Sequence, residues 1–233
     1  MRLKTEYSDE NFVQETHWEK AAKTNMGKYL TQLETCFIFK ALDFSRENIV
    51  VMDVGAEAGR VSLVALNAKA TVVSIDIDRL SLKRLKQKTT QAHIILADAR
   101  KLPFKDDLFD ATFMIEVMDY VPELGLALTE CNRTLKNEGL CVLSFGNKGS
   151  VKAKIKGLRG KSYLHSYRNV VQGLFTTGFV LKKQMGYNWL PFNRVSENRF
   201  VPILAWFEWV FGLRKLAMYS PWVIIHMVKQ SKQ

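Results

Sequence analysis

The chain has 233 residues, of which 47% are hydrophobic and 24% are charged. This composition suits a globular protein and excludes general disorder, and the length favours one domain with room for a sizeable core. The formal charge of +11 indicates an anionic partner, such as nucleic acid, a membrane surface or an acidic substrate, without choosing among them.

Positive charge is concentrated in the C-terminal part of the chain. Residues 1–145 carry 19 basic and 21 acidic side chains, for a net charge of −2. Residues 146–233 carry 15 basic side chains and only two acids, Glu197 and Glu208, for a net charge of +13. We therefore expect the anionic partner to bind on the C-terminal side.

The sequence argues against several other kinds of protein. The three cysteines have neither a CxxC pair nor a Cys/His ligand spacing, so we expect no disulfide framework and no metal site. The first residues lack the apolar segment of a secretory signal. The longest apolar stretch, Phe200–Leu213, is interrupted by Glu208 and is too short to span a bilayer. We expect a cytoplasmic protein that can still associate with a membrane surface.

Short β-branched runs and helical segments alternate through the middle of the chain, after a helical cap at residues 1–45. Such alternation is typical of βαβ units, in which helices cover both faces of a parallel sheet. The expected strands are Ile49–Val54, Thr71–Ile77, Ile94–Ala97, Ala111–Ile115 and Leu140–Phe145. The expected helices between them are Gly59–Asn67, Leu80–Thr89 and Glu123–Leu135.

The C-terminal part departs from this alternation. A basic stretch is followed by an expected helix at Tyr167–Thr177 and a sixth strand at Gly178–Lys183. An aromatic-rich insertion at residues 188–220 separates that strand from a closing strand at Trp222–Val228. We expect a single domain over residues 1–233, with the sheet core at 49–183 and the closing strand at 222–228.

A glycine-containing turn follows the first expected strand. The residues from Asp53 to Gly59 read DVGAEAG and lead into a helix. Glycine suits such a turn either because the backbone approaches a ligand or because a tight turn needs a positive φ. Backbone N–H groups at the helix start would suit an anion. Taken alone, the turn leaves a structural and a ligand-binding interpretation open.

Carboxylates follow the next two expected strands. Asp76 ends the second strand, where an acid can accept hydrogen bonds from both ribose hydroxyls of a nucleoside. After the third strand, Asp98 can accept from the exocyclic amine of adenine, and Ala99 can donate its N–H to a ring nitrogen. Together these positions favour a cofactor that contains a nucleoside. Asp110 is assigned to packing at the entry to the fourth strand.

These pieces together resemble the class I S-adenosylmethionine-dependent methyltransferases, in particular those that act on small molecules and lipids. The matching stretches read DVGAEAG, SIDID, ADARKLPFKDDLFD and ECNRTLKNEGLCVLSF, and they cover Ile49 to Phe145 in the family's order and spacing. The resemblance implies a Rossmann-like α/β fold with a mostly parallel seven-stranded sheet flanked by helices. It also implies methyltransferase activity, with S-adenosyl-L-methionine bound by the core.

The same resemblance implies a cofactor site. Its residues are Asp53 and Gly55 at the methionine end, Asp76 at the ribose, Asp98 and Ala99 at the adenine, Glu116 at the active-site floor, and Ala56, Glu57, Gly59 and Ile77 alongside them. Glu57 departs from the family pattern, which usually has glycine there. Its carboxylate can meet the amino group or the sulfonium of the cofactor, can point to solvent, or can weaken binding. Because both turn glycines remain, we expect binding to be intact.

Methyl transfer is an in-line displacement for which the enzyme supplies mainly alignment and desolvation, with a base for some hydroxyl nucleophiles. The sequence does not assign that base. The candidates are Asp119 and Tyr120 after the fourth strand, His165 in the loop after the fifth strand, and His17 in the N-terminal cap. An exposed loop position for His165 and core packing for His17 are the alternatives.

The signal for the acceptor lies in the C-terminal third. The insertion holds eight aromatic residues, most of which we expect to form the core of a cap helix. The alternative is an apolar pocket or a face at a membrane interface. Lys148–Arg168 holds seven basic residues and no acid, which suits either a solvated face or an anionic membrane surface.

The sequence therefore predicts a methyltransferase whose acceptor is small or amphiphilic and anionic, such as a lipid or a lipid-linked glycan. One alternative is an RNA methyltransferase that uses the basic stretch 148–168 on phosphates. Nucleic acid is the weaker candidate, because Ile115–Met118 is not an NPPY-type tetrapeptide. The other alternative is a non-catalytic cofactor-binding protein, which Glu57 motivates. The oligomeric state is left undefined.

Overall fold

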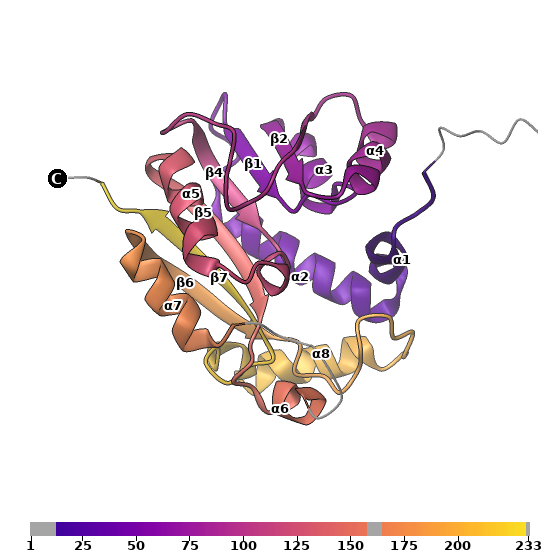
Figure 1. The fold of residues 1–233 in the computed structure, drawn as a ribbon. Coiled ribbons are helices and arrows are strands. Elements are labelled where there is room, and N and C mark those ends of the chain that lie inside the picture. The colour runs from indigo at the N-terminus through magenta and orange to yellow at the C-terminus, as the bar shows by residue number, and fades with distance from the viewer. Residues whose placement is uncertain (1–12, 158–164, 232–233) are drawn as a thin grey trace, which may run out of the picture.

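The computed structural model describes residues 13–157 and 165–231, and seven strands of this part of the chain form one sheet. The strands are β1 (Val50–Val54), β2 (Thr71–Asp76), β3 (His93–Leu96), β4 (Phe109–Met114), β5 (Leu135–Gly146), β6 (Phe179–Tyr187) and β7 (Trp222–Lys229). Their order in the sheet is β3-β2-β1-β4-β5-β7-β6 (Figure 1). All pairs are parallel except those of β7, which runs antiparallel to β5 and β6. The predicted, mostly parallel seven-stranded sheet is confirmed.

Helices connect the strands and precede the first one. The α-helices are α1 (His17–Lys23), α2 (Asn25–Ala41), α3 (Arg60–Asn67), α4 (Arg79–Lys88), α5 (Leu124–Thr134), α6 (Val151–Gly157), α7 (Tyr167–Thr176) and α8 (Val201–Val210), with 3-10 turns η1 (Met118–Tyr120) and η2 (Leu213–Lys215). Within the described residues, no helix is long and apolar enough to cross a membrane.

The sheet separates two hydrophobic layers. Met52 and Val54 of β1 pack in the layer that includes the buried residues of α5 and α7. Val51 of the same strand faces the opposite layer, together with residues of α2, α3 and α8. Because successive side chains of a strand point to opposite faces, a strand covered on both sides must be apolar throughout. This requirement explains the β-branched runs that the sequence shows.

Two strands are longer than their local sequence suggests. β6 extends to Tyr187, which pairs with Trp222 of β7, whereas the sequence predicted an end at Lys183. β5 begins at Leu135, which pairs with Phe109 ahead of an irregularity in the ladder. In both cases a neighbouring strand supplies the hydrogen-bond partners, so the length of the strand depends on tertiary pairing.

The insertion between β6 and β7 corrects the expectation that its aromatic residues are mostly core. Trp189 and Phe192 are partly buried, and the other six aromatic side chains of the insertion are exposed. α8 lies on the molecule through one face only, and its buried residues are Val201, Ala205 and Glu208. A helix on a surface buries only one stripe of side chains. A helix of this composition therefore leaves aromatic residues outside.

The basic stretch is likewise more than a solvated face. Lys152 Nζ donates to the backbone carbonyls of Asn188 at 3.0 Å and Leu190 at 2.6 Å, and so ties α6 to the segment that follows β6. Lys148, Lys154 and Arg168 are exposed. The side chains of Lys156, Arg159 and Lys161 lie outside the described part of the chain.

Candidate active site

A cavity of about 870 Å³ opens where the C-terminal ends of β1, β2 and β4 meet the N-terminal cap. Its volume lies within the range of roughly 300–1,000 Å³ that is typical of small-molecule sites. Nine of the ten residues that the sequence assigned to a cofactor line the cavity, and Gly59 does not. Clefts at the carboxyl ends of parallel strands are the usual ligand sites of open α/β sheets.

The backbone of the glycine turn is already hydrogen-bonded within the protein. The N–H groups of Gly55 and Ala56 both donate to Ile75 O at 2.8 Å, and Gly59 N–H donates to Ala56 O at 2.8 Å. Glu57 N–H donates to Asp76 Oδ2 at 2.8 Å. These four donors are therefore not free to bind an anion, and anion binding at the start of α3 stays a prediction. The turn instead holds the first two strand ends together.

Both turn glycines are required by backbone conformation and by close packing. Gly55 has a φ of +71°, and a Cβ there would lie 2.2 Å from Val117 Cγ2. Gly59 has a φ of +88°, and its Cβ would lie 2.3 Å from Leu85 Cδ1. Gly59 therefore lets α4 pack against the turn from behind, outside the cavity.

Two glutamates of the cavity wall adopt the left-handed backbone conformation. Glu57 has a φ of +48° and Glu116 has a φ of +63°. The left-handed region costs a non-glycine residue roughly 1–2 kcal/mol. Strained backbone is concentrated at functional sites, where the surrounding structure enforces it. The conformation at Glu57 gives a physical reason why glycine suits this position.

Asp76 and Asp53 lie at the ends of β2 and β1 in different environments. Asp76 accepts from Glu57 N–H through Oδ2 and from Asp78 N–H through Oδ1, both at 2.8 Å, and its side chain lines the cavity. Asp53 is buried and accepts from Ser62 Oγ at 2.6 Å. Burial raises the pKa of Asp53 to about 6. Asp76 thus has lone pairs available to the cavity, whereas Asp53 is held mainly by the protein.

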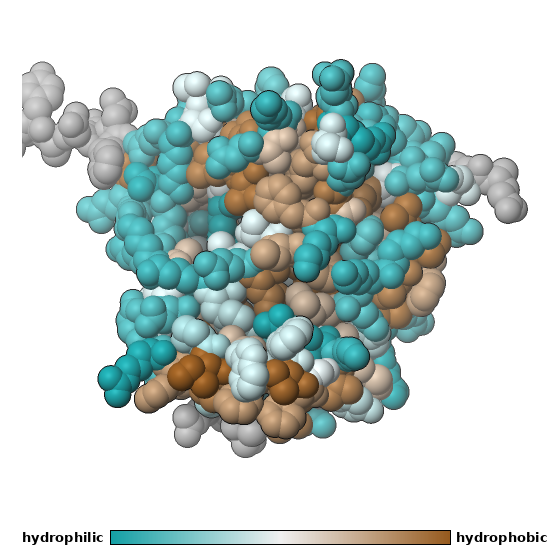
Figure 2. Space-filling model, turned by 180° about the vertical axis from the view of Figure 1, so that it is seen from behind, coloured by the Kyte–Doolittle hydropathy of each residue, from teal (hydrophilic) through white to brown (hydrophobic). Residues whose placement is uncertain are grey.

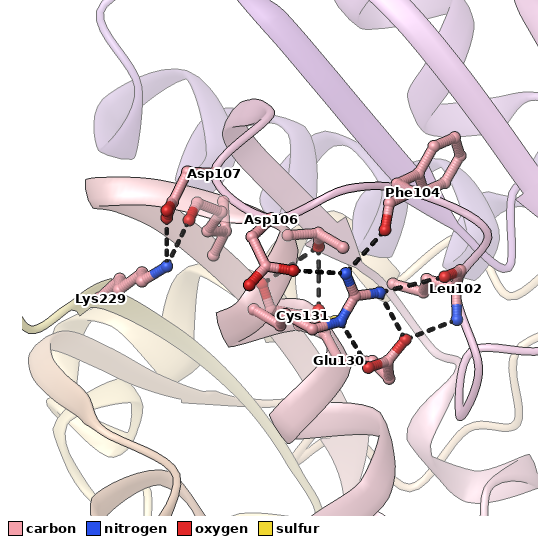
Figure 3. Close-up of polar contacts among 10 residues, drawn as sticks. Leu102, Phe104, Asp106, Asp107, Glu130, Cys131 and Lys229 are labelled. Atoms are coloured by element: carbon pink, nitrogen blue, oxygen red, sulfur yellow. Dashed lines mark hydrogen bonds and ion pairs between the residues drawn. The ribbon is translucent and has the colours of Figure 1, made fainter.

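The loop between β3 and β4 carries Asp98 and Ala99, and a network centred on Arg133 of α5 holds it (Figure 3). Arg133 donates to Phe104 O at 2.6 Å and to Leu102 O at 3.1 Å. Its guanidinium also pairs with Asp106 at 2.8 Å and with both carboxylate oxygens of Glu130, each at 2.8 Å. Glu130 in turn accepts from Leu102 N–H at 2.7 Å.

This network brings together two of the stretches that carried the family resemblance, ADARKLPFKDDLFD and ECNRTLKNEGLCVLSF. Lys229 of β7 completes it by donating to Asp107 Oδ1 and to Leu135 O, both at 2.6 Å. The shared pattern therefore serves to position the loop. Within the loop, Arg100 Nη2 pairs with Asp98 at 2.7 Å.

Glu116 belongs to a cluster of four charged residues that the sequence did not reveal as a group, and two of its members, Arg60 and Glu116, line the cavity. Arg60 pairs with Glu34 of α2 and, at 3.3 Å, with Glu116. Arg194, from the segment between β6 and α8, pairs with Glu116 and lies 4.0 Å from Glu34. The two acids and two bases balance in charge.

The deepest member of this cluster is Glu34, which is 1% exposed and accepts from Tyr187 Oη at 2.8 Å. Although burial opposes ionisation, the guanidinium groups of Arg60 and Arg194 hold the pKa of Glu34 below its usual value. Burial also lowers the pKa of Arg194, to about 10. Glu34 shares the buried face of α2 with Leu30 and Phe37, and a charge on such a face is the signal that could have identified it.

The N-terminal cap closes the cavity on the side opposite the strands. Thr16 begins α1 in a capping box with Glu19, so that the helix starts at His17. His17 and Trp18 both line the cavity. Arg194 lies over the Trp18 ring, with 5.3 Å between its Cζ and the ring centroid. The cap and the segment after β6 therefore meet at this wall.

The four candidate bases are not all brought together. His17 and Tyr120 line the cavity, whereas Asp119 and His165 are absent from its lining. His165 is buried, with its Nε2 hydrogen-bonded to Val121 O at 2.8 Å, so it is not an exposed loop residue. Asp119 accepts from Gly146 N–H at 3.0 Å, and burial raises its pKa to about 6. Only the first two candidates are placed to face a ligand.

Sequence comparisons identify relatives of the central part of the chain. A methyltransferase-domain family matches residues 52–143. An uncharacterized protein of Methanocaldococcus jannaschii is 31% identical over 140 residues, which are 58% of this chain and 60% of that protein. The sterol 4-C-methyltransferase strm-1 of Caenorhabditis elegans is 32% identical over 110 residues, which are 45% of this chain and 33% of that enzyme. The chain thus spans less than two thirds of the length of these relatives.

Solved structures show the same fold. The [4+2]-cyclase SpnF superposes with a TM-score of 0.68 over 91% of this chain and 84% of SpnF, at 17% identity. The magnesium protoporphyrin IX methyltransferase of Synechocystis, solved with bound SAH, superposes with a TM-score of 0.62 over 93% of this chain and 89% of its own, also at 17% identity. The cyclase shows that one fold serves more than one reaction.

Proposed function

We propose that this chain, a class I S-adenosylmethionine-dependent methyltransferase in domain family and in fold, transfers a methyl group to a small or amphiphilic, anionic acceptor. The observation that carries the proposal is the cavity itself. It brings Asp53, Asp76, Asp98 and Glu116, which are far apart in the sequence, to one edge of the sheet.

The residues of the cavity fit the cofactor. Asp76 offers carboxylate lone pairs to a ribose, and Ile77, whose side chain is 72% exposed, offers an apolar face for a planar base. Ala99 and Asp98 lie on the loop that the Arg133 network holds in place. We assign the adenosyl end of the cofactor to this side, and the methionine end to the wall formed by Asp53, Gly55 and Glu116.

S-adenosylmethionine supplies an electrophilic methyl group when it is bound. The protein's own residues align the acceptor with that group and exclude water, which is the main contribution that such a reaction needs. His17 and Trp18 cover the cavity from the cap, and Tyr120 faces it from the end of the sheet. We propose His17 as the group that takes a proton from a hydroxyl acceptor, because its imidazole lines the cavity. Tyr120 would orient the acceptor by hydrogen bonding.

The nature of the acceptor is inferred from the surface around the cavity. The net positive charge of the chain lies C-terminal to residue 145, and Arg194 of this part pairs with Glu116, which lines the cavity. A sterol methyltransferase among the relatives is in keeping with an amphiphilic acceptor. We propose a lipid or lipid-linked glycan with a negatively charged group, and an anionic membrane surface as the place where the protein meets it. RNA is the weaker candidate, because Ile115–Met118 is not an NPPY-type tetrapeptide and Lys152 of the basic stretch is engaged with backbone carbonyls.

The proposal is tested in two steps. Calorimetric titration measures the binding of S-adenosylmethionine to the wild-type chain and to Asp76→Ala, with Asp43→Ala as the matched control, because Asp43 is exposed and is absent from the cavity lining. We expect the first substitution to weaken binding and the second to leave it within about twofold. Incubation with methyl-labelled cofactor and a fractionated cell extract then shows whether the label enters lipid, glycan or RNA.

Each outcome distinguishes among the candidates. The absence of cofactor binding would contradict the proposal as a whole. Label in RNA would replace the lipid acceptor, and binding without transfer to any fraction would favour a non-catalytic cofactor-binding protein.

A further inference from the structure

The solvent-facing side of α8 consists of large apolar side chains. Trp206 is 55% exposed, Trp209 64% and Phe211, directly after the helix, 69%. Figure 2 shows apolar side chains at the lower end of the molecule, and Figure 1 places α8 at that end. We call this surface the α8 face. Its members are Ile203, Trp206, Phe207, Trp209, Val210 and Phe211.

Packing within the chain does not account for the α8 face. The Phe207 ring stacks on the Phe211 ring at 5.7 Å and meets the Trp206 ring edge-on at 5.2 Å, so these rings contact each other on the outside. A surface helix normally places polar residues on its outer side. A contiguous exposed apolar surface indicates an interaction site.

The charges around the α8 face select the kind of partner. Glu208, the only acid of the helix, is turned inward, where it accepts from Tyr29 Oη at 2.5 Å and from Trp189 N–H at 2.7 Å. The outer side therefore carries no acid. Arg199 precedes the helix and Lys215 follows it, and both are exposed. Arg214 instead donates to Tyr29 Oη at 3.4 Å, and the nearby acid Glu197 accepts from Asn25 N–H at 3.2 Å. Apolar side chains bordered by cations complement a surface that is apolar inside and anionic outside.

We propose that the α8 face docks on the interface of an anionic lipid bilayer. Tryptophan is the residue that favours this interface, and a helix of ten residues is about 15 Å long, which suits lying in the interface plane and not crossing it. Basic residues beside the apolar face add electrostatic attraction to anionic lipid.

The chain segment before α8 links the docking surface to the cavity wall. In this segment, which lies between β6 and α8, Arg194 pairs with Glu116 in the cavity wall. The segment is also bonded to the start of α2. Thr24 Oγ1 donates to Arg194 O and Asn25 Nδ2 donates to Glu197 O, both at 2.9 Å. The docking surface and the cavity thus share one connecting segment. This inference rests on the proposed function, since it names where a membrane-resident acceptor would enter.

Vesicle flotation with the full chain tests the proposal. The probes are vesicles of phosphatidylcholine alone and vesicles with 30% phosphatidylglycerol. Trp206→Ser/Trp209→Ser removes two members of the α8 face, and Leu126→Ser/Phe175→Ser removes two equally exposed apolar residues of α5 and α7 as the matched control. Arg199→Gln/Lys215→Gln removes two bordering charges, with Lys83→Gln/Lys86→Gln on α4 as the control for charge.

We expect the wild-type chain to bind the anionic vesicles, the tryptophan variant to bind them at least about tenfold more weakly, and both controls to bind like wild type. The Arg199/Lys215 variant should lose about fivefold per charge on anionic vesicles and little on neutral ones. Circular dichroism and calorimetric binding of S-adenosylmethionine verify that each variant is folded and keeps its cofactor site.

Three results would overturn the inference. The first is that the tryptophan variant binds anionic vesicles as strongly as the wild-type chain does. The second is that the wild-type chain binds neither kind of vesicle. The third is a wild-type dimer in sedimentation velocity that the tryptophan substitutions abolish, with no binding to vesicles. The last result would make a second copy of the chain the occupant. Because cofactor binding is measured separately, failure of the docking surface is distinguishable from failure of the proposed function.

Discussion

Substitution of Arg133 by alanine should destabilise the fold and weaken cofactor binding together. The guanidinium makes five hydrogen bonds, two of them to the backbone carbonyls of Leu102 and Phe104 in the loop that follows β3. Alanine removes all five and leaves those carbonyls and the Glu130 carboxylate without their main partner. The loop carries Asp98 and Ala99, so its order bears on the cofactor site.

The magnitude follows from the individual contacts. Asp106 is largely exposed, so its ion pair adds little. The two carbonyl bonds and the half-shielded pair with Glu130 should each contribute about 1 kcal/mol, for a total loss of about 3 kcal/mol in the free energy of unfolding. Arg133→Lys keeps the charge but cannot reach all partners at once, so it should lose about 1–2 kcal/mol.

Equilibrium urea unfolding measures the stability, and calorimetry measures the dissociation constant of S-adenosylmethionine. We expect Arg133→Ala to raise that constant about tenfold, which is a loss of about 1.4 kcal/mol in the free energy of binding. The reason is that the loop must then become ordered when the cofactor binds. Arg79→Ala on the exposed start of α4 is the matched control and should change neither quantity. An Arg133→Ala protein that unfolds at the wild-type urea midpoint would refute the argument that this network holds the loop.

Four further predictions concern single side chains. Burial raises the pKa of Asp119 to about 6, so the folded protein keeps a proton that the unfolded chain releases above about pH 4. The free energy of unfolding therefore falls as the pH rises from about 4 to about 6. Asp119→Asn, which can still accept from Gly146 N–H, should abolish that fall and be more stable than wild type by about 2–3 kcal/mol at pH 8 in urea unfolding. Glu57→Gly should leave the unfolding free energy equal or raise it by about 1 kcal/mol, because relief of the left-handed conformation exceeds the chain entropy of glycine; a loss would contradict the assigned strain. His165→Ala should lower the unfolding free energy by about 1–2 kcal/mol through loss of its bond to Val121 O and leave the rate of methyl transfer unchanged. His17→Gln should slow transfer to a hydroxyl acceptor about 100-fold or more without changing cofactor affinity, and an unchanged rate would remove His17 as the base.

Local sequence patterns predicted where the strands lie and placed the ends of α3, α4, α5 and α7 to within one residue, and with the family resemblance they predicted nine of the residues that line the cavity. The reason is physical. A strand buried on both faces must be apolar throughout, and the turns between β-strands and α-helices need particular residues such as Gly55. Because the ends of parallel strands lie at one edge of the sheet, Asp53, Asp76 and Asp98 could be placed near each other from their positions in the chain alone.

Only the tertiary structure decided how those groups are used. The N–H groups of the glycine turn are taken up by Ile75 O and Asp76, which depends on how closely β1 and β2 approach. Arg194 reaches Glu116 across 78 residues of chain, and no local pattern carries that pairing. Which face of α8 is buried depends on where the helix lies against α2. An aromatic residue has the same sequence signature in a core and on a surface, so the exposure of the α8 face could be seen only in the folded molecule.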